Sequence, residues 1–243
     1  MMLQESIPLG LDLRFLVSSP DDPVAQVSAY CSVGSPTSPA DLERFAHTVD
    51  VMTFDHEVVD LAALEHLEAN GHLLAPDAAS FATVSDKARM RAALTSAGIP
   101  VPEAVVTEDA EHISRLVAAR GPQVLKVAHG GYDGRGTFFV DDPAEASRIA
   151  SVTDGPLLVE PRLDLIAELA AIVVIGRDGG RVGYDPVLTI QVEGQCRRID
   201  APAALSDEII ESARELAGAA AEAVGATGVV ATELFLTSEG LLV

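Results

Sequence analysis

The sequence has few of the features that nucleic-acid-binding and membrane-bound proteins need. Only 16 of its 243 residues are lysine or arginine, against 37 aspartates and glutamates, so its net charge is -21. A surface this acidic repels nucleic-acid phosphates and anionic lipid headgroups. No apolar run is long enough to cross a bilayer, and the first residues lack the basic start of a secretory signal. We therefore expect a cytoplasmic protein that binds neither nucleic acid nor membranes.

Cysteine and aromatic residues are also scarce. Cys31 and Cys196 lie far apart and form no CxxC pattern, which argues against a structural zinc site or a disulfide framework. Aromatic residues make up 4% of the chain and tryptophan is absent, so the core must consist of alanine, valine, leucine and isoleucine. With 48% hydrophobic residues, the chain can form one large domain or two to three small lobes.

Short strand and helix patterns alternate along the chain. Strands are expected at 11–17 and 49–54 and a helix at 61–70, which together favour a parallel, Rossmann-like opening lobe. A helix at 85–97 would be capped by Ser85 and ended by Gly98. Further helices are predicted at 107–120 and 206–224, and further strands at 123–127, 137–140, 157–160, 170–175, 182–184 and 229–236.

The most informative segment is the glycine-rich turn between the strands at 123–127 and 137–140. It reads Lys-Val-Ala-His-Gly-Gly-Tyr-Asp-Gly-Arg-Gly from Lys126 to Gly136. Glycines permit positive φ and close backbone approach, so successive N–H groups can surround an anion. Lys126 and Arg135 add positive charge. A strand on both sides excludes the Walker A and Rossmann patterns, which leaves a phosphate-binding hairpin or an ordinary hairpin with a glycine-rich turn.

A wider pattern favours the phosphate-binding interpretation. The lysine-ended strand followed by Gly-Gly-Tyr-Asp-Gly-Arg-Gly resembles the ATP-grasp signature of the N5-carboxyaminoimidazole ribonucleotide synthases. Related carboxylases and peptide ligases share the lysine and the glycine loop but usually lack the Tyr-Asp pair. The resemblance implies an α/β ATP-grasp fold with a truncated Rossmann-like, biotin-carboxylase-like N-terminal lobe. That lobe would span 1–82, followed by a lid lobe at 83–156 and a large lobe at 157–243.

The resemblance also implies a nucleotide site. Lys87, Lys126 and the glycine loop would hold the ATP phosphates, the backbone at 160–163 would bind adenine, and Glu168 would accept from the ribose hydroxyls. Without the resemblance, Lys87 and Glu168 would be solvated surface residues. The nucleotide-binding residues expected on this basis are Lys87, Lys126, Gly131, Tyr132, Asp133, Gly134, Arg135, Gly136, Thr137, Glu160, Pro161, Arg162, Leu163, Glu168 and Gln191.

Glu233 is the residue expected to bind magnesium. Strand alternation places it on the same face as Ala231 and Phe235. A carboxylate that points inward from an apolar strand is costly unless it is paired or metal-bound, and Mg²⁺ takes one or two carboxylates plus nucleotide phosphates. The catalytic residues implied by the resemblance are Glu57, Tyr132, Asp133 and Arg135.

The reaction implied by the resemblance uses ATP and Mg²⁺ to convert bicarbonate into carboxyphosphate. The carboxyl group then passes to the exocyclic amine of 5-aminoimidazole ribonucleotide, a step of de novo purine biosynthesis carried out by homodimers. Family members continue beyond both ends of this sequence, and the expected continuation after Val243 includes the second metal ligand. Two alternatives stay open: another ATP-grasp carboxylate–amine ligase, or a protein that binds ATP without turnover.

Overall fold

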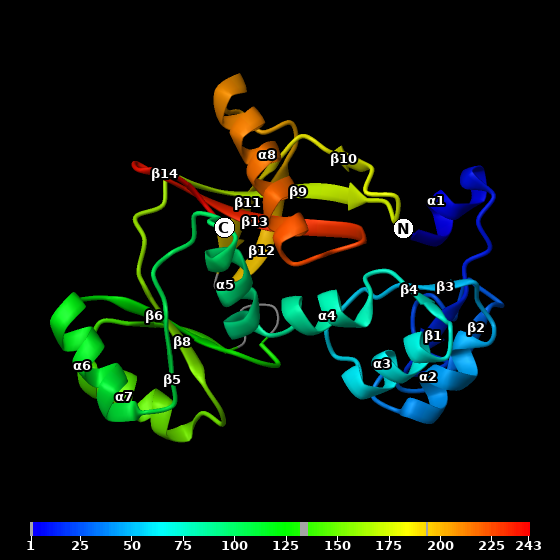
Figure 1. The fold of residues 1–243 in the computed structure, drawn as a ribbon, viewed down its shortest axis with the longest axis horizontal. Coiled ribbons are helices and arrows are strands. Elements are labelled where there is room, and N and C mark those ends of the chain that lie inside the picture. The colour runs from blue at the N-terminus through cyan, green and yellow to red at the C-terminus, as the bar shows by residue number, and fades with distance from the viewer. Residues whose placement is uncertain (1, 132–135, 193) are drawn as a thin grey trace. The chain divides into compact units, whose positions relative to one another are not determined.

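The chain folds into two compact units. The computed structural model describes residues 2–131, 136–192 and 194–243, and its units are Met1–Ala78 and Ala79–Val243 (Figure 1). Among the described residues, no helix is both long and apolar enough to cross a membrane.

The first unit contains two pairs of short parallel strands. Strand β1 (Phe15–Val17) pairs with β2 (Cys31–Val33), and β3 (Val51–Met52) pairs with β4 (Leu73–Leu74). The helices are α1 (Met2–Leu9), α2 (Pro39–Ala46) and α3 (Leu61–Ala69). The Ser38 and Asp60 side chains cap α2 and α3 by accepting backbone N–H bonds. Parallel pairing agrees with the alternating pattern of the sequence, although β1 and β3 are shorter than the predicted strands.

The second unit begins with two consecutive helices, α4 (Ala78–Val84) and α5 (Lys87–Ser96). The Ser85 hydroxyl donates to the Phe81 carbonyl in the last turn of α4. Asp86 caps α5 by accepting from the N–H groups of Ala88 and Arg89. The prediction that Ser85 caps this helix was therefore wrong by one residue, because the serine hydroxyl bonds back into the preceding helix.

A four-stranded antiparallel sheet follows, in the order β5-β8-β6-β7. Its strands are β5 (Val105–Thr107), β6 (Gln123–Val127), β7 (Thr137–Val140) and β8 (Leu157–Pro161). Helices α6 (Ala110–Arg120) and α7 (Pro143–Val152) pack side by side on one face, around a core that includes Ile113, Leu125 and Ile149 (Figure 1). The helix predicted at 107–120 starts at Ala110 instead, because Asp109 caps it and Thr107 ends β5.

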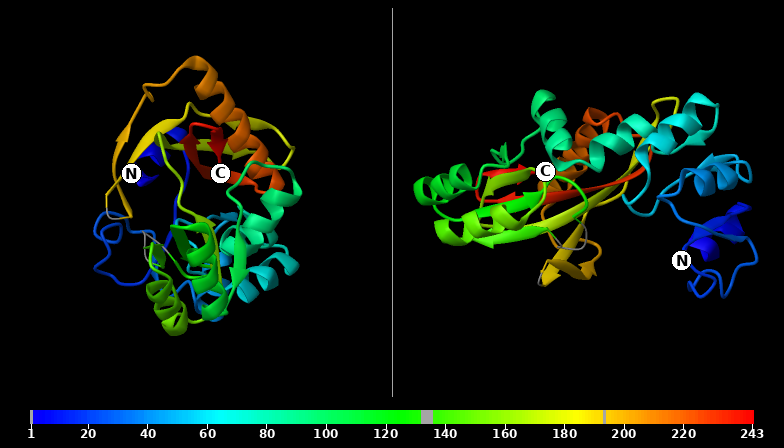
Figure 2. Two further views of the ribbon diagram at one scale, coloured as in Figure 1. Left: turned by 90° about the vertical axis from the view of Figure 1, so that its left-hand side faces the viewer. Right: turned by 90° about the horizontal axis from the view of Figure 1, so that it is seen from below.

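The six-stranded sheet is also antiparallel, in the order β12-β11-β9-β13-β14, with β10 paired to β9. Its strands are β9 (Ala167–Ile175), β10 (Arg181–Gly183), β11 (Val187–Val192), β12 (Gln195–Asp200), β13 (Gly228–Thr237) and β14 (Gly240–Leu242). Helix α8 (Asp207–Ala223) packs its alanines against Leu169, Ala171 and Leu234. The views in Figure 2 show α8 in orange beside these strands. The opposite face of the sheet is free of α8.

Strand β8 belongs to the smaller sheet, where it pairs with both β5 and β6. The expected boundary between a lid lobe and a large lobe fell just before this strand. The division at 83–156 and 157–243 stays a prediction, and strand pairing groups β8 with the glycine-rich hairpin.

Candidate functional site

Three sequence-predicted residues of the second unit, Lys126, Glu168 and Glu233, lie on the sheet faces turned away from α6, α7 and α8. On β6, Leu125 points into the core with α6 and α7, so the next residue, Lys126, points to the other face. On β13, Leu234 points towards α8, so Glu233 and Phe235 point away from it. Lys126 Nζ lies 5.8 Å from the centre of the Phe235 ring. This contact shows that the two sheet faces lie next to each other.

Lys126 is held by a buried carboxylate. Its Nζ lies 2.6 Å from Glu160 Oε2, and the Glu160 side chain is 4% exposed. The other carboxylate oxygen, Oε1, accepts a hydrogen bond from the guanidinium of Arg91 on α5. Arg91 also donates to the Pro102 carbonyl at 3.2 Å. Two cations therefore share one buried anion.

The electrostatics of this triad follow from its burial. Burial lowers the pKa of Arg91, and the Glu160 carboxylate raises it. Because each oxygen of Glu160 meets a different cation, the carboxylate is satisfied and the group as a whole keeps a positive charge. This positive site lies within a chain of net charge -21.

The hairpin that carries Lys126 needs glycine at its second strand. Gly136 has φ +80°, and a Cβ there would lie 2.3 Å from Val127 Cγ2. The Gly136 carbonyl accepts the Val127 N–H at 2.8 Å and closes the hairpin. Four residues expected at the tip, Tyr132, Asp133, Gly134 and Arg135, lie outside the described residues.

The start of α5 is bound to the near side of the same hairpin. The Lys87 N–H donates to the Ala128 carbonyl at 2.9 Å, and Lys87 Nζ lies 3.4 Å from the Gly131 carbonyl. His129 Nε2 lies 3.5 Å from Asp86 Oδ2. Lys87 and Lys126 are the only lysines in the 243-residue sequence, and both lie beside this turn.

Glu168 and Glu233 lie on the same face of the six-stranded sheet. Glu168 on β9 pairs with Phe235 on β13, and Glu233 is two residues from Phe235, so the carboxylates are diagonal neighbours. Burial raises the pKa of Glu168, the Glu233 carboxylate raises it further, and Lys126 acts in the opposite direction. Glu233 is exposed. The expectation that its carboxylate points into an apolar interior was wrong, because α8 covers the other face of β13.

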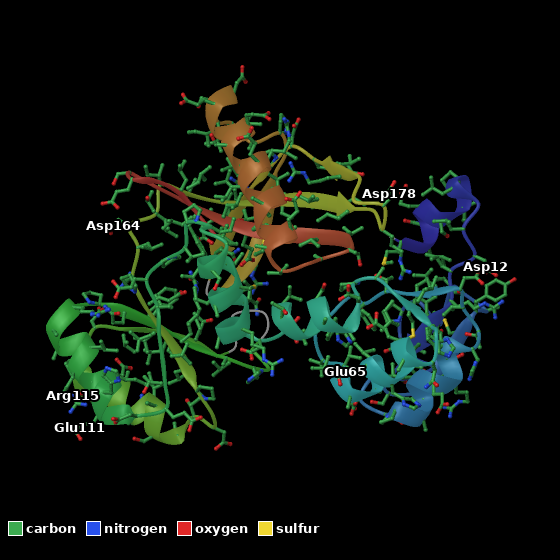
Figure 3. The ribbon with its side chains drawn as sticks, in the orientation of Figure 1. Asp12, Glu65, Glu111, Arg115, Asp164 and Asp178 are labelled. Carbon is green, nitrogen blue, oxygen red and sulfur yellow. The ribbon has the colours of Figure 1, made fainter. Side chains whose placement is uncertain are left out.

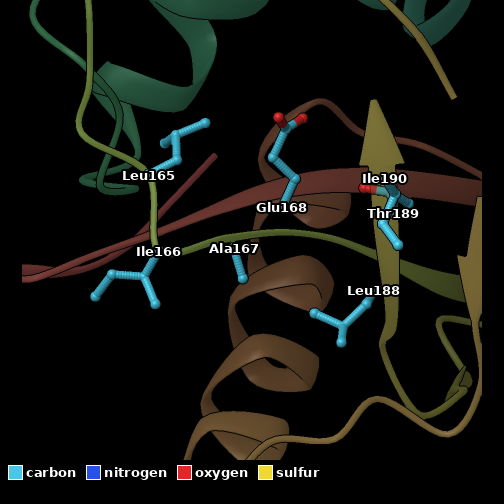
Figure 4. A pocket seen from close by; sticks show the side chains of 7 residues that line it. All are labelled: Leu165, Ile166, Ala167, Glu168, Leu188, Thr189 and Ile190. Atoms are coloured by element: carbon cyan, nitrogen blue, oxygen red, sulfur yellow. The ribbon is translucent and has the colours of Figure 1, made fainter. Parts of the chain in front are cut away.

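A cavity of about 370 Å³ lies beside Glu168. Figure 4 shows the Glu168 carboxylate pointing to one side of β9 and the Ala167 and Leu188 side chains to the other. The cavity is lined by Leu165, Ile166, Ala167, Glu168, Leu188, Thr189 and Ile190. Gln191 lies on β11, two residues beyond Thr189, which pairs with Glu168.

The remaining described residues of the predicted set fall into two groups: Thr137 borders this centre, and the others lie away from it. Pro161 ends β8 at the end of the sheet opposite the glycine turn, since it pairs with Gln123. Arg162 is exposed and its side chain lies near Asp141, with a 3.7 Å ion pair, while Leu163 is half-buried. Thr137 starts β7 opposite Lys126. Glu57 is an exposed loop residue of the first unit.

Arg91 and Phe235 belong to this site but were not predicted from the sequence. Arg91 lies four residues after Lys87, so the helical period places both on one face of α5, and that spacing could have identified it. Its partner Glu160 is 69 positions away in sequence, which no local pattern reveals. Phe235 was noted only as a neighbour of Glu233.

The donors present suit magnesium better than a transition metal. Within the described ranges, no group of three or more histidine, cysteine or acidic side chains could hold a metal ion. Glu168 and Glu233 supply hard carboxylate oxygens, and Mg²⁺ commonly uses one or two of these together with nucleotide phosphates and water. The residues present therefore fit Mg²⁺ bound jointly with a nucleotide.

Comparisons with known families cover nearly the whole chain. Residues 92–243 match the model described as "ATP-grasp domain". Residues 1–85 match the "Ribonucleotide synthetase preATP-grasp domain". Among curated proteins, the N5-carboxyaminoimidazole ribonucleotide synthase of Mycobacterium bovis is 42% identical over 98% of this chain. The chain spans 57% of the length of that relative.

Solved structures show the same fold. A carboxyaminoimidazole ribonucleotide synthase from Aspergillus clavatus, complexed with ATP, has a TM-score of 0.87 at 29% identity and matches 99% of this chain and 65% of that one. The Aspergillus clavatus synthase in complex with ADP and 5-aminoimidazole ribonucleotide has a TM-score of 0.87 at 27% identity, covering 100% of this chain and 64% of that one. The expected ATP-grasp fold is confirmed.

Proposed function

The chain belongs to the ATP-grasp family, and on that premise we propose that it carries the nucleotide-binding part of an N5-carboxyaminoimidazole ribonucleotide synthase. The reaction is the ATP-dependent carboxylation of 5-aminoimidazole ribonucleotide by bicarbonate, through carboxyphosphate. One observation carries the proposal: Lys126, on a glycine-rich hairpin, faces Phe235 and Glu168 across the two sheets, and Glu233 lies on the same sheet face as both. Relatives that share this fold are named for this reaction, and two solved structures hold ATP, or ADP with the ribonucleotide.

In this proposal the positive side of the site binds the triphosphate. Lys126 and Lys87 supply positive charge to the phosphates, and the backbone N–H groups of the described glycines Gly130, Gly131 and Gly136 supply hydrogen bonds. Tyr132, Asp133 and Arg135, which lie outside the described residues, act on the second substrate. The backbone at 160–163 binds adenine, with Gln191 on the neighbouring sheet.

The carboxylate side of the site binds the ribose and the metal. Glu168 accepts from the ribose hydroxyls, and Glu233 holds Mg²⁺ with the phosphates. Mg²⁺ supplies charge stabilisation for phosphoryl transfer when it is bound.

The finer parts of the assignment rest on the family alone. They are the use of bicarbonate, the role of Glu57 near the carboxylation site, the three-lobe division and the homodimer. The cytoplasmic location stays an expectation from the sequence. The experiment below tests bicarbonate use directly.

The test measures phosphate release from Mg-ATP with and without 5-aminoimidazole ribonucleotide and bicarbonate. Two proteins are compared: the 243-residue chain, and the same chain extended at both ends with the flanking segments of the Mycobacterium bovis relative. Isotopic bicarbonate follows the carboxyl group into an acid-labile product. Lys126→Met in each background serves as the control and lowers turnover by about 100-fold, since it removes a preorganised charge.

The proposal predicts ribonucleotide-stimulated phosphate release and label incorporation in the extended form. If the 243-residue chain binds Mg-ATP without turnover and the extended form turns over, the flanking segments supply further residues that turnover needs. If neither folded protein responds to the ribonucleotide, the synthase assignment is wrong. Stimulation by a different amine acceptor would then point to another ATP-grasp carboxylate–amine ligase.

A further inference from the structure

Arg91 has no role in the nucleotide contacts described above, yet it is among the least exposed basic side chains of the site. Its side chain is 13% exposed, and it points from α5 towards β8. One nitrogen of its guanidinium donates to Glu160 Oε1, and the other donates to the Pro102 carbonyl at 3.2 Å. The fork of the guanidinium thus fixes the position of one carboxylate oxygen.

The orientation of Glu160 in turn decides where Lys126 lies. With Oε1 taken by Arg91, Glu160 offers Oε2 to Lys126, at 2.6 Å. In this position Lys126 Nζ lies 5.8 Å from the centre of the Phe235 ring. Phe235 lies on the same sheet face as Glu168 and Glu233. Without Arg91, both oxygens of Glu160 would be available to Lys126, and the charge of the group would fall from positive to neutral.

We propose that Arg91 is a positioning residue for nucleotide binding. By occupying one oxygen of Glu160, Arg91 prevents that carboxylate from capturing Lys126 and keeps the site positive for the phosphates of a nucleotide. The inference rests on the proposed function, because it assumes that Lys126 meets those phosphates. It goes further by assigning a role to a residue on α5 that contacts no expected ligand.

The rival explanation is that Arg91 serves only to attach α5 to β8. A buried ion pair that loses one partner leaves an uncompensated charge and destabilises the fold. That role predicts a lower melting temperature for an Arg91 variant but an unchanged affinity in its folded fraction. Affinity and stability therefore have to be measured separately.

The first measurement is the affinity for Mg-ADP by isothermal titration calorimetry, with thermal melting of each protein alongside. The variants are Arg91→Met, Arg91→Gln as a second neutral form in case the first does not fold, and Arg91→Lys, which keeps the charge. Arg115→Met is the matched control. Arg115 lies beside Glu111 on the outer side of α6, with its Nη1 3.1 Å from Glu111 Oε1 and its side chain 62% exposed (Figure 3). Its replacement by methionine removes the same single positive charge as Arg91→Met.

We expect the neutral Arg91 variants to bind Mg-ADP roughly tenfold more weakly, because the group formed by Glu160 and Lys126 then carries no net positive charge for the phosphates. Arg91→Lys should recover most of that loss, and Arg115→Met should bind like the unaltered chain. Unchanged affinity in the neutral variants, or an Arg91→Lys protein as weak as they are, would overturn the proposal.

The second measurement does not depend on nucleotide and uses the chain's two lysines. Limited acetylation followed by mass spectrometry reports the reaction rate of Lys126, with Lys87 as the internal reference. Capture of Lys126 by both oxygens of Glu160 predicts slower acetylation of Lys126 in Arg91→Met. Simple loosening of the structure predicts faster acetylation, and that result would contradict the proposal. If the unaltered chain binds no Mg-ADP, the proposed function fails, while the acetylation ratio still tests Arg91.

Discussion

At the scale of single residues, the site places a carboxylate where it is poorly solvated. Glu168 is half-buried on β9, burial and the Glu233 carboxylate both raise its pKa, and Lys126 offsets only part of this. A raised pKa means that the folded chain binds the proton more tightly than the unfolded chain does. This contribution to stability is full below the ordinary carboxyl pKa of 4.5 and is lost as the pH rises through the raised value.

Glu168→Gln removes the ionisable group and should therefore stabilise the chain where Glu168 would be charged. In metal-free buffer we expect a higher melting temperature than that of the unaltered chain at about pH 7, with the gain shrinking towards about pH 4. Glu215→Gln, an exposed carboxylate on α8, is the control and should change little at either pH. A Glu168→Gln protein that melts lower at neutral pH would show that Glu168 forms a net favourable contact.

Residues whose chemistry depends on a local pattern could be predicted from the sequence, and those that depend on distant partners could not. Lys126 and Lys87 were identified because they border the glycine turn and a helix start. Glu160 was expected to act through its backbone, yet its side chain holds two cations contributed by α5 and β6. Period-two alternation placed Glu233 correctly relative to Phe235, but it does not say which face α8 covers.

At the scale of elements, two glycines at the ends of the hairpin's turn should lose different amounts of stability when they are replaced by alanine. Gly130 has φ +73°, and a Cβ atom added there would have no other atom within 4 Å. Gly136 has φ +80°, and an added Cβ would lie 2.3 Å from Val127 Cγ2. Gly130→Ala should cost about 1–2 kcal/mol of unfolding free energy, from the left-handed backbone alone. Gly136→Ala should cost at least about 3 kcal/mol, because steric overlap adds to the same strain.

Urea unfolding of both variants measures these losses. Val127→Ala combined with Gly136→Ala relieves the overlap, so the double variant should be more stable than the sum of the single losses predicts. Equal losses for the two glycine variants, or strict additivity in the double variant, would show that Val127 moves aside without cost. Mg-ADP affinity measured on the same proteins tells whether the hairpin geometry also matters for the ligand.

The elements themselves were predicted where their ends carry a chemical signal. Helix α8 has its N-cap at Ser206 and its C-cap at Val224, which agrees with the predicted helix at 206–224. Strands β11 and β12 were missed because most of their residues are partly or fully exposed, so no apolar alternation marks them. Helices α2, α4 and α7 were missed as well, although Ser38 and Asp142 cap α2 and α7.

At the scale of the whole molecule, the described contacts of the proposed nucleotide site all belong to the second unit. The Arg91–Glu160–Lys126 triad, the Lys87 contact with Gly131, and the pair Glu168 and Glu233 all lie within Ala79–Val243. The Ser80 hydroxyl donates to the Gly225 carbonyl at 2.6 Å, which attaches the start of this unit to the segment before β13. Its two sheets each have a core of their own.

We therefore expect a protein that consists of residues 79–243 to fold and to bind Mg-ADP within about threefold of the affinity of the whole chain, a difference below 1 kcal/mol. Circular dichroism melting checks folding, calorimetry checks binding, and Lys126→Met in the short protein is the control that should abolish binding. A folded short protein that binds more than about tenfold more weakly would show that the first unit supplies nucleotide contacts. Glu57, the one predicted site residue in that unit, would then be the first position to substitute in the whole chain.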